Sequence, residues 1–293
     1  MNNNPDHESR VTGWFPGHML KAEKAMQKLL PLVDIVVEVV DARAPLSSRN
    51  PKLVQILSSK PHIVLANKSD LANPTMNRAW KQWFSREADE VDFIDAAHLR
   101  NPAILTERWK ELVNKTRAER GATRPLLRPV RLMIVGIPNI GKSTLINRMR
   151  MKNIAIMGPK PGVTRNNQWV PLTGGMELLD TPGVLWPQLR DKQQELLLTA
   201  LGNISDDATD PIETCEFLIT KLREINPTEP FKSLDLGELP ETPLALLEKL
   251  ALRRGMLLPG GLPATLNAAH AFLKDYRAGK LGRFTLEVPG GKE

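Results

Sequence analysis

The pattern of hydrophobic positions predicts short buried strands that alternate with amphipathic helices. Apolar, β-branched runs occupy residues 34–40, 62–66, 91–96, 130–135 and 176–179. Helical periodicity fills the intervals, at residues 49–59, 75–88, 102–118 and 142–150. Such alternation is typical of βαβ units and a parallel sheet. We therefore expect an α/β domain, with helices on both faces of a mainly parallel sheet.

The strand pattern fades after about residue 187, and helical patterns follow at residues 193–201, 243–254 and 264–277. This change of period indicates a second, smaller and mostly helical domain. We expect an N-terminal arm over residues 1–30 that belongs to the α/β domain, the main part of that domain over residues 31–190, and the helical domain over residues 191–293.

Charge is distributed unevenly along the 293 residues, which carry 40 Lys+Arg, 33 Asp+Glu and a net charge of +7. Residues 100–170 contain 15 basic and 3 acidic residues, whereas residues 171–250 contain 6 basic and 15 acidic residues. A basic block of this kind indicates a surface for a polyanion such as a nucleic acid. Solvated helices that simply carry many charges are the alternative.

Several classes of protein are disfavoured by composition. A single cysteine, Cys215, excludes a disulfide framework and a Cys-x-x-Cys metal site. The sequence contains no apolar run near the ~18 residues that cross a bilayer. Its first residues lack the basic and apolar regions of a signal peptide. We expect a cytoplasmic protein without a membrane span.

A phosphate-binding loop is predicted where Gly136-Ile137-Pro138-Asn139-Ile140-Gly141-Lys142-Ser143 fits the pattern G-x-x-x-x-G-K-[ST] between a strand and a helix. Glycines allow backbone N–H groups to approach phosphate oxygens, and the helix N-terminus adds a positive dipole. The lysine reaches the β- and γ-phosphates, and the serine hydroxyl binds Mg²⁺. The nucleotide-binding residues expected here are Asn139, Ile140, Gly141, Lys142, Ser143 and Thr144.

Two further elements are expected to sense the γ-phosphate. Asp180-Thr181-Pro182-Gly183 ends an apolar strand 37 residues after Ser143, where Asp180 would hold Mg²⁺ through water and Gly183 would meet the nucleotide. Between them, the loop around Thr164 offers a hydroxyl as a second protein ligand of Mg²⁺, ordered when the γ-phosphate is present. A plain turn and a solvent-facing threonine are the alternatives.

The base is predicted from Asn67-Lys68-Ser69-Asp70, which follows a buried strand. The Asp70 carboxylate can accept hydrogen bonds from N1–H and the 2-amino group of guanine, a donor pair that adenine lacks. Asn67 would meet the O6/N7 side, and the stem of Lys68 would lie over the ring. The ligands expected are GTP and GDP, although the four residues alone could also cap a helix.

The order of these elements is unusual, because Asn67–Asp70 precedes the phosphate loop by about 70 residues. In ordinary small GTPases the phosphate loop comes first, so the domain resembles a circularly permuted GTPase. A sheet whose chain ends lie close together tolerates such a permutation. In this order the Asp180 switch leads directly into the helical domain, which could receive its movement.

Taken together, the motifs resemble the ribosome biogenesis GTPase A family of bacteria and its mitochondrial relatives. The resemblance spans nearly the whole chain and includes Trp14–Met19, Asp41-Ala42-Arg43-Ala44-Pro45 with Ser47–Pro51, Asn67–Asp70, Gly136–Ser143, Pro161–Arg165, Asp180–Gly183 and Arg277–Arg283. It implies GTP hydrolysis coupled to late assembly of the large (50S) ribosomal subunit, with ribosomal RNA as the contact surface and a C-terminal RNA-contacting domain. Nothing in the sequence demands an oligomer.

The sequence departs from the family pattern at two places. The guanine-supporting loop, placed at Asp95-Ala96-Ala97, lacks the usual serine before Ala96. Residues 262–267 carry less charge than family members usually do, which weakens the expectation of RNA contacts there.

The catalytic set is incomplete by the usual pattern, because Val184, Leu185 and Trp186 follow Gly183 where many GTPases place a water-orienting Gln. The resemblance points instead to His18, whose alternative role is to hold the N-terminal segment or touch RNA. Asn139 resembles the asparagine of potassium-dependent GTPases, which implies a K⁺ ligand. We expect Lys142 and Thr164 to complete the catalytic residues, with slow intrinsic turnover that the ribosomal subunit stimulates.

Two other functions stay open at this point. One is an RNA-binding scaffold in which GTP is a structural ligand and hydrolysis is incidental. The other is a GTPase that acts on another RNA, such as tRNA during its modification, or at a membrane.

Overall fold

A computed structural model describes residues 24, 26–50, 53–57, 60–124, 126–150, 168–180, 189 and 191–290 of the chain. The chain separates into two compact units. The first, a sheet with helices, comprises Ala25–Gln188 together with the final residues from Glu287 onward. The second, a helical unit, comprises Met1–Lys24 and Leu189–Leu286, of which residues 24, 189 and 191–286 are described.

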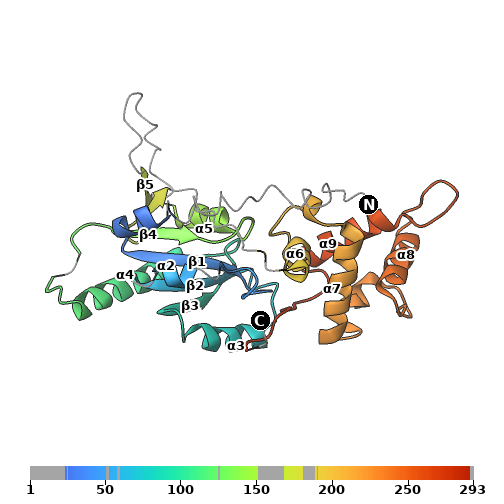
Figure 1. Cartoon of the computed structure of the whole chain (residues 1–293), viewed down its shortest axis with the longest axis horizontal. Coiled ribbons are helices and arrows are strands. Elements are labelled where there is room, and N and C mark those ends of the chain that lie inside the picture. The colour runs from blue at the N-terminus through green and yellow to red at the C-terminus, as the bar shows by residue number, and fades with distance from the viewer. Residues whose placement is uncertain are drawn as a thin grey trace, which may run out of the picture. The chain divides into compact units, whose positions relative to one another are not determined.

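The first unit is built on a sheet with six described strands, in the order β3-β2-β1-β4-β6-β5 (Figure 1). Their bounds are β1 Ile35–Asp41, β2 His62–Asn67, β3 Glu90–Phe93, β4 Val130–Val135, β5 Gln168–Leu172 and β6 Met176–Asp180. All neighbouring pairs are parallel except β5 with β6. The carboxyl ends of β1, β2, β4 and β6 therefore lie along one edge, where ligands bind in open α/β sheets.

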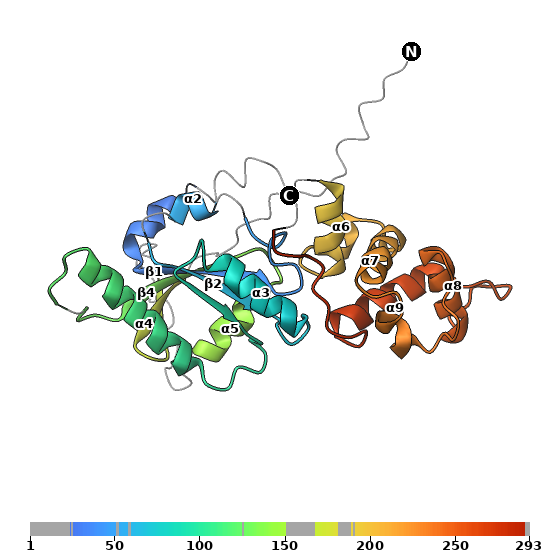
Figure 2. The same ribbon diagram turned by 90° about the horizontal axis from the view of Figure 1, so that it is seen from below.

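Helices cover both faces of this sheet (Figures 1 and 2). One face packs against α2, through Leu53 and Leu57, and against α3, through Trp80 and Phe84. The alternate residues of the same strands are also buried, and α4 and α5 cover that second face. The bounds are η2 Leu30–Leu32, α2 Leu53–Leu57, α3 Pro74–Phe84, α4 Pro102–Glu119 and α5 Lys142–Met149. Burial on both faces explains why the strands read as continuous apolar runs.

The helical unit consists, over its described residues, of α6 Lys192–Ala200, η3 Asp206–Ala208, α7 Pro211–Ile225, η4 Glu229–Leu234, α8 Pro243–Arg253 and α9 Thr265–Arg277. Its core is formed by leucines of α6, α7 and α8 with Phe272 and Tyr276 of α9. Several helices of the chain start with the same local signal, a polar cap followed by proline, as at Asp210-Pro211 and Thr242-Pro243. The side-chain oxygen of the cap residue accepts hydrogen bonds from backbone N–H groups that the first turn leaves unpaired. Proline has no backbone N–H, so it leaves no such group unpaired.

The fold class predicted from the sequence is confirmed. Among the described strands and α-helices, two were not predicted: the edge strand β5, whose run is interrupted by Pro171, and α7, within the acidic stretch. The third strand is shorter than expected, since Ile94–Ala96 already form a loop. Among the helices described, none combines the length and the apolar run that a membrane crossing requires.

Candidate functional site

The phosphate loop joins β4 to α5, and two of its glycines are required by space. A Cβ at Gly136 would lie 2.6 Å from the Val39 carbonyl oxygen of the neighbouring strand. A Cβ at Gly141 would lie 2.1 Å from Nδ2 of Asn67, and this residue has a φ of +101°. The loop therefore runs close against β1 and β2.

Lys142 begins α5 and folds its side chain back over the loop. Its ammonium donates to the carbonyl oxygens of Gly136 (2.9 Å) and Ile137 (2.5 Å). Burial lowers the pKa of Lys142 to about 8. Ser143 and Thr144 follow in the exposed first turn of α5, so their hydroxyls are open to a phosphate or a hydrated Mg²⁺.

Asn67 ends β2 and connects two loops. Its Nδ2 donates to the carbonyl oxygen of Ile140 (2.8 Å), and its Oδ1 accepts from the backbone N–H of Ala96 (2.9 Å). The side chain is buried, and both ends of its amide are engaged by backbone. Asn67 thus holds the phosphate loop and the 95–98 loop together, and its contact with the O6/N7 side of the base stays a prediction.

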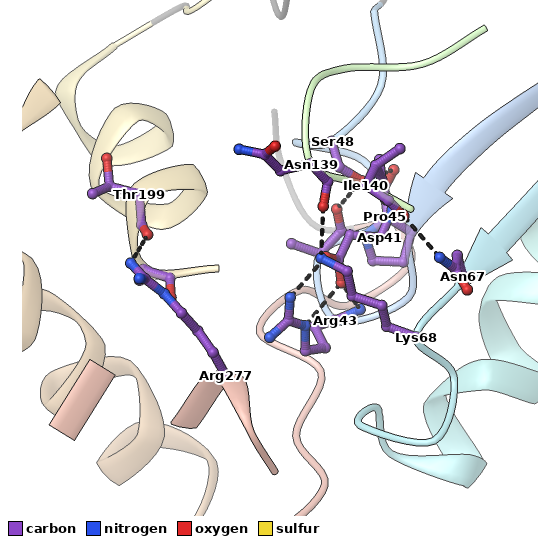
Figure 3. A network of polar contacts seen from close by, with 12 residues as sticks. Asp41, Arg43, Pro45, Ser48, Asn67, Lys68, Asn139, Ile140, Thr199 and Arg277 are labelled. Atoms are coloured by element: carbon purple, nitrogen blue, oxygen red, sulfur yellow. Dashed lines mark hydrogen bonds and ion pairs between the residues drawn. The ribbon is translucent and has the colours of Figure 1, made fainter. Parts of the chain in front are cut away.

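Lys68 follows Asn67 at the same edge (Figure 3), and Asp70 lies two residues further along the chain. Lys68 has a left-handed backbone (φ +60°), and its ammonium donates to Asp41 Oδ2 (3.0 Å) and to the Asn139 carbonyl oxygen (3.1 Å). Asp70 is partly exposed, and no partner for its carboxylate occurs in the part of the chain that the structure describes. That carboxylate is available to a base.

The 95–98 loop is held by its own aspartate. Asp95 accepts backbone N–H groups of Ala97 (2.9 Å) and His98 (3.2 Å), and its second oxygen meets His98 Nδ1 at 2.5 Å. Burial would raise the pKa of Asp95, but the hydrogen bonds from the His98 ring and from the backbone hold it below its ordinary value. Arg148 of α5 donates to the Ala97 carbonyl oxygen. The aspartate that replaces the usual serine therefore shapes this loop, while Ala96 gives its N–H to Asn67.

The remaining expected residues are only partly covered. Asp180 is the last residue of β6, a strand adjacent to β4. Thr164, Gly183 and His18 lie outside the described residues. Asn139 is exposed and left-handed, with φ +53°. The described residues contain no group of three or more His, Cys, Asp or Glu side chains that could hold a metal.

Sequence reasoning missed the role of Asp41 and Arg43. They were noted only as part of a motif, yet they form a buried ion pair of 2.8 Å in direct contact with Lys68. Burial would raise the pKa of Asp41, but Arg43 and Lys68 hold it far below its ordinary value. One signal in the sequence could have indicated this role. The motif comes at the end of one buried strand, and Asn67 ends the strand beside it.

Comparisons with known proteins identify the family to which the chain is similar. A family described as "50S ribosome-binding GTPase" matches residues 131–229. "Ribosome biogenesis GTPase A" of Bacillus licheniformis is 40% identical over 279 residues, which cover 95% of this chain and 99% of that protein. "Mitochondrial ribosome-associated GTPase 1" of Bos taurus is 33% identical, with 94% of this chain and 89% of that protein covered. The crystal structure of GNP-bound YlqF from T. maritima superposes with a TM-score of 0.67 at 26% identity, over 92% of this chain and 99% of that one.

Proposed function

The chain belongs to the ribosome biogenesis GTPase A family, and from this premise we propose that it binds the immature large (50S) ribosomal subunit and couples GTP hydrolysis to a late step of its assembly. As a member of this family it is a GTPase of ribosome biogenesis that binds GTP and GDP. The proposal adds the subunit as partner and the roles of individual residues.

The main support for a nucleotide site is that three loops meet at one edge of the sheet: the phosphate loop, the 95–98 loop and the turn that contains Lys68 and Asp70. Asn67 ties the phosphate loop to the 95–98 loop, and Lys68 bonds the phosphate loop a second time. Asp70 projects from the same turn without a partner among the described residues. A guanine would fit these groups, with its N1–H and 2-amino group donating to Asp70 and its ring against the Lys68 stem.

Catalysis in this proposal needs charge neutralisation and an oriented water. Lys142 moves from its two carbonyl oxygens to the β- and γ-phosphates. Ser143, Thr164 and Asp180 would hold Mg²⁺, which would screen the charge of the phosphates. His18 orients the attacking water, because no Gln follows Gly183. Asn139 supplies one ligand of a K⁺ ion.

The contact with ribosomal RNA is proposed to involve the basic block of the first unit. Lys115, Arg100 and Arg124 of this block are exposed. The helical unit is less suited by charge alone, because Leu189–Leu286 carries 12 basic and 14 acidic residues. Two of its basic side chains are also engaged, since Lys280 and Arg254 both pair with Asp275. Arg283 is exposed and would be its clearest phosphate contact.

The first experiment is GTP turnover with and without purified large subunits, in KCl and in NaCl at equal ionic strength. Stimulation only in KCl supports both the ribosomal partner and the ion site at Asn139. Stimulation in both salts supports the partner and removes the potassium claim. No stimulation favours a scaffold that binds RNA, or a different RNA such as tRNA.

Two variants sharpen this experiment. Asn139→Gly keeps the left-handed backbone without strain and removes the side-chain carbonyl, so it should abolish a potassium effect and leave folding intact. Lys142→Ala tests the scaffold: a protein that needs GTP only as a structural ligand would keep its role in assembly if RNA binding survives.

A further inference from the structure

Asp41 lies beside the base site because of strand register. β1 and β2 run parallel, and Asp41 pairs with Asn67 across them. The last residue of β1 thus reaches the sheet edge next to the turn that carries Lys68 and Asp70. The segment Asp41–Ser48 that begins here has no assigned part in the site proposed above.

The Asp41 carboxylate is fully buried and binds two cations (Figure 3). Its Oδ1 accepts from Arg43 Nε (2.9 Å) and from the Arg43 backbone N–H (3.1 Å). Its Oδ2 accepts from Arg43 Nη2 (2.8 Å) and from Lys68 Nζ (3.0 Å). The planar guanidinium fixes the carboxylate in one orientation, so one oxygen is held in position for Lys68.

Lys68 is the residue that needs such support. Its left-handed backbone is unfavourable for a residue with a side chain, and its ammonium also bonds the carbonyl oxygen of Asn139, another left-handed residue. Asp41 therefore secures the point where the turn before Asp70 meets the phosphate loop. The Lys68 side chain is 23% exposed, so part of it remains open to a ligand.

The far end of the 41–48 segment is anchored as well. Ser48 Oγ donates to the Ala44 carbonyl oxygen (2.7 Å) and accepts from the Asp41 backbone N–H (2.8 Å). The Glu287 carboxylate accepts backbone N–H groups of Leu46 (2.7 Å) and Ser47 (3.0 Å). With both ends fixed, the segment is a rigid support rather than a surface loop.

We propose that Asp41 is a positioning residue of the guanine site: it holds the Lys68 stem and the Asp70 turn in the geometry that receives the base. This inference rests on the proposed function, because it needs Lys68 and Asp70 to face guanine. Asp41 acts on the part of the site that binds the base, so its loss should affect the affinities for GDP and GTP equally. Hydrolysis of bound GTP is not its target.

The same strand supplies a matched control. Glu38 lies three positions before Asp41, is also buried, and also receives a bidentate arginine, Arg49 (3.1 and 2.9 Å). Its other partner is His62 (3.0 Å), at the opposite end of β2 from Asn67. Glu38→Gln and Asp41→Asn therefore remove equivalent buried charges, but only the second lies at the base site.

The test measures affinity for a fluorescent GDP, affinity for unlabelled GDP and GTP by displacement, kcat and KM for GTP, and urea unfolding. We expect both variants to unfold at lower urea. Only Asp41→Asn should weaken GDP and GTP, each about tenfold (about 1.4 kcal/mol), with KM raised and kcat within about twofold. Unchanged affinity in Asp41→Asn, or the same loss in Glu38→Gln, would overturn the proposal.

A double-mutant cycle tests whether Asp41 acts through Lys68, and Lys68→Met alone gives a measurement that does not depend on how well Asp41→Asn folds. Lys68→Met removes the ammonium that pairs with Asp41, at a side chain that is partly exposed. This variant should weaken GDP binding about as much as Asp41→Asn does. If Asp41 acts through Lys68, adding Asp41→Asn to Lys68→Met weakens GDP no further. Independent, additive losses would overturn the proposal.

Asp70→Asn separates this inference from the proposed function. The new amide donates to the 2-carbonyl of xanthine, so this variant should prefer xanthosine diphosphate over GDP. If it does, and Asp41→Asn behaves like Glu38→Gln, only the positioning role fails. If Asp70→Asn binds GDP as the parent does, the guanine site itself is misplaced and the inference falls with it.

Discussion

Gly141→Ala is the substitution for which the structure predicts the clearest damage. Gly141 has a φ of +101°, and a Cβ there would lie 2.1 Å from Asn67 Nδ2. Backbone strain of this kind costs about 1–2 kcal/mol. The clash would also displace Asn67, whose amide makes two backbone hydrogen bonds. At about 0.5–1.5 kcal/mol each, these bring the expected loss in unfolding free energy to about 2–5 kcal/mol.

Gly121→Ala serves as the matched control. Gly121 has a similar φ of +87°, but no atom lies within 4 Å of the added Cβ. Its cost should be the backbone strain alone, about 1–2 kcal/mol. The difference between the two variants therefore measures the loss of the Asn67 bridge.

The assay is urea unfolding without nucleotide, followed by tryptophan emission. Five of the six tryptophans, all except Trp14, fall within Ala25–Gln188, so emission reports mainly on the sheet-containing unit. Gly141→Ala should also lose nucleotide affinity, because Asn67 holds two loops of the site. Equal stability of Gly141→Ala and Gly121→Ala would refute the bridging role of Asn67.

Three further predictions follow from single side chains. Burial holds the pKa of Lys142 in the free protein at about 8, whereas bound phosphates favour its charged form. GTP affinity, measured in binding titrations from pH 7 to 9.5, should therefore fall about tenfold per pH unit above pH 8. Lys142→Arg, which stays charged, should show no such fall, and a flat profile of the parent protein would contradict this prediction. Burial raises the pKa of Cys215 to about 12, so a thiol reagent at pH 8 should modify Cys215 far more slowly in the native protein than in urea. Equal rates of modification would show that the Cys215 thiol is accessible in the native protein. Arg277 binds Asp206 and the carbonyl oxygens of Thr199 and Ala200, so Arg277→Met should destabilise the helical unit by about 1–3 kcal/mol. Circular dichroism measures this loss, because Leu189–Leu286 is helical and contains no tryptophan. The exposed Lys274, on the same helix, provides the control: Lys274→Met should leave the stability unchanged.

Much of the fold was predictable because local signals agree with it. Buried strands on both faces produce continuous apolar runs, and the runs ending at Val135 and near Asn67 identified their strands almost to the residue. The edge strand β5 was missed because an edge tolerates Pro171 and needs no continuous apolar run. α7 was missed although Asp210-Pro211 is a start signal, because its acidic residues obscured the apolar stripe.

The sequence alone determined the chemistry of the site. Spacing in Gly136–Ser143 and Asn67–Asp70 specifies phosphate and guanine ligands, and their order specifies a permuted chain. Tertiary structure decided which groups serve each other: Asp41 meets Lys68 only because β1 pairs in register with β2, and Asn67 reaches Ile140 across 73 positions of sequence. A buried carboxylate must find a cation, but its sequence does not say which one, since the neighbour is chosen by strand order and register.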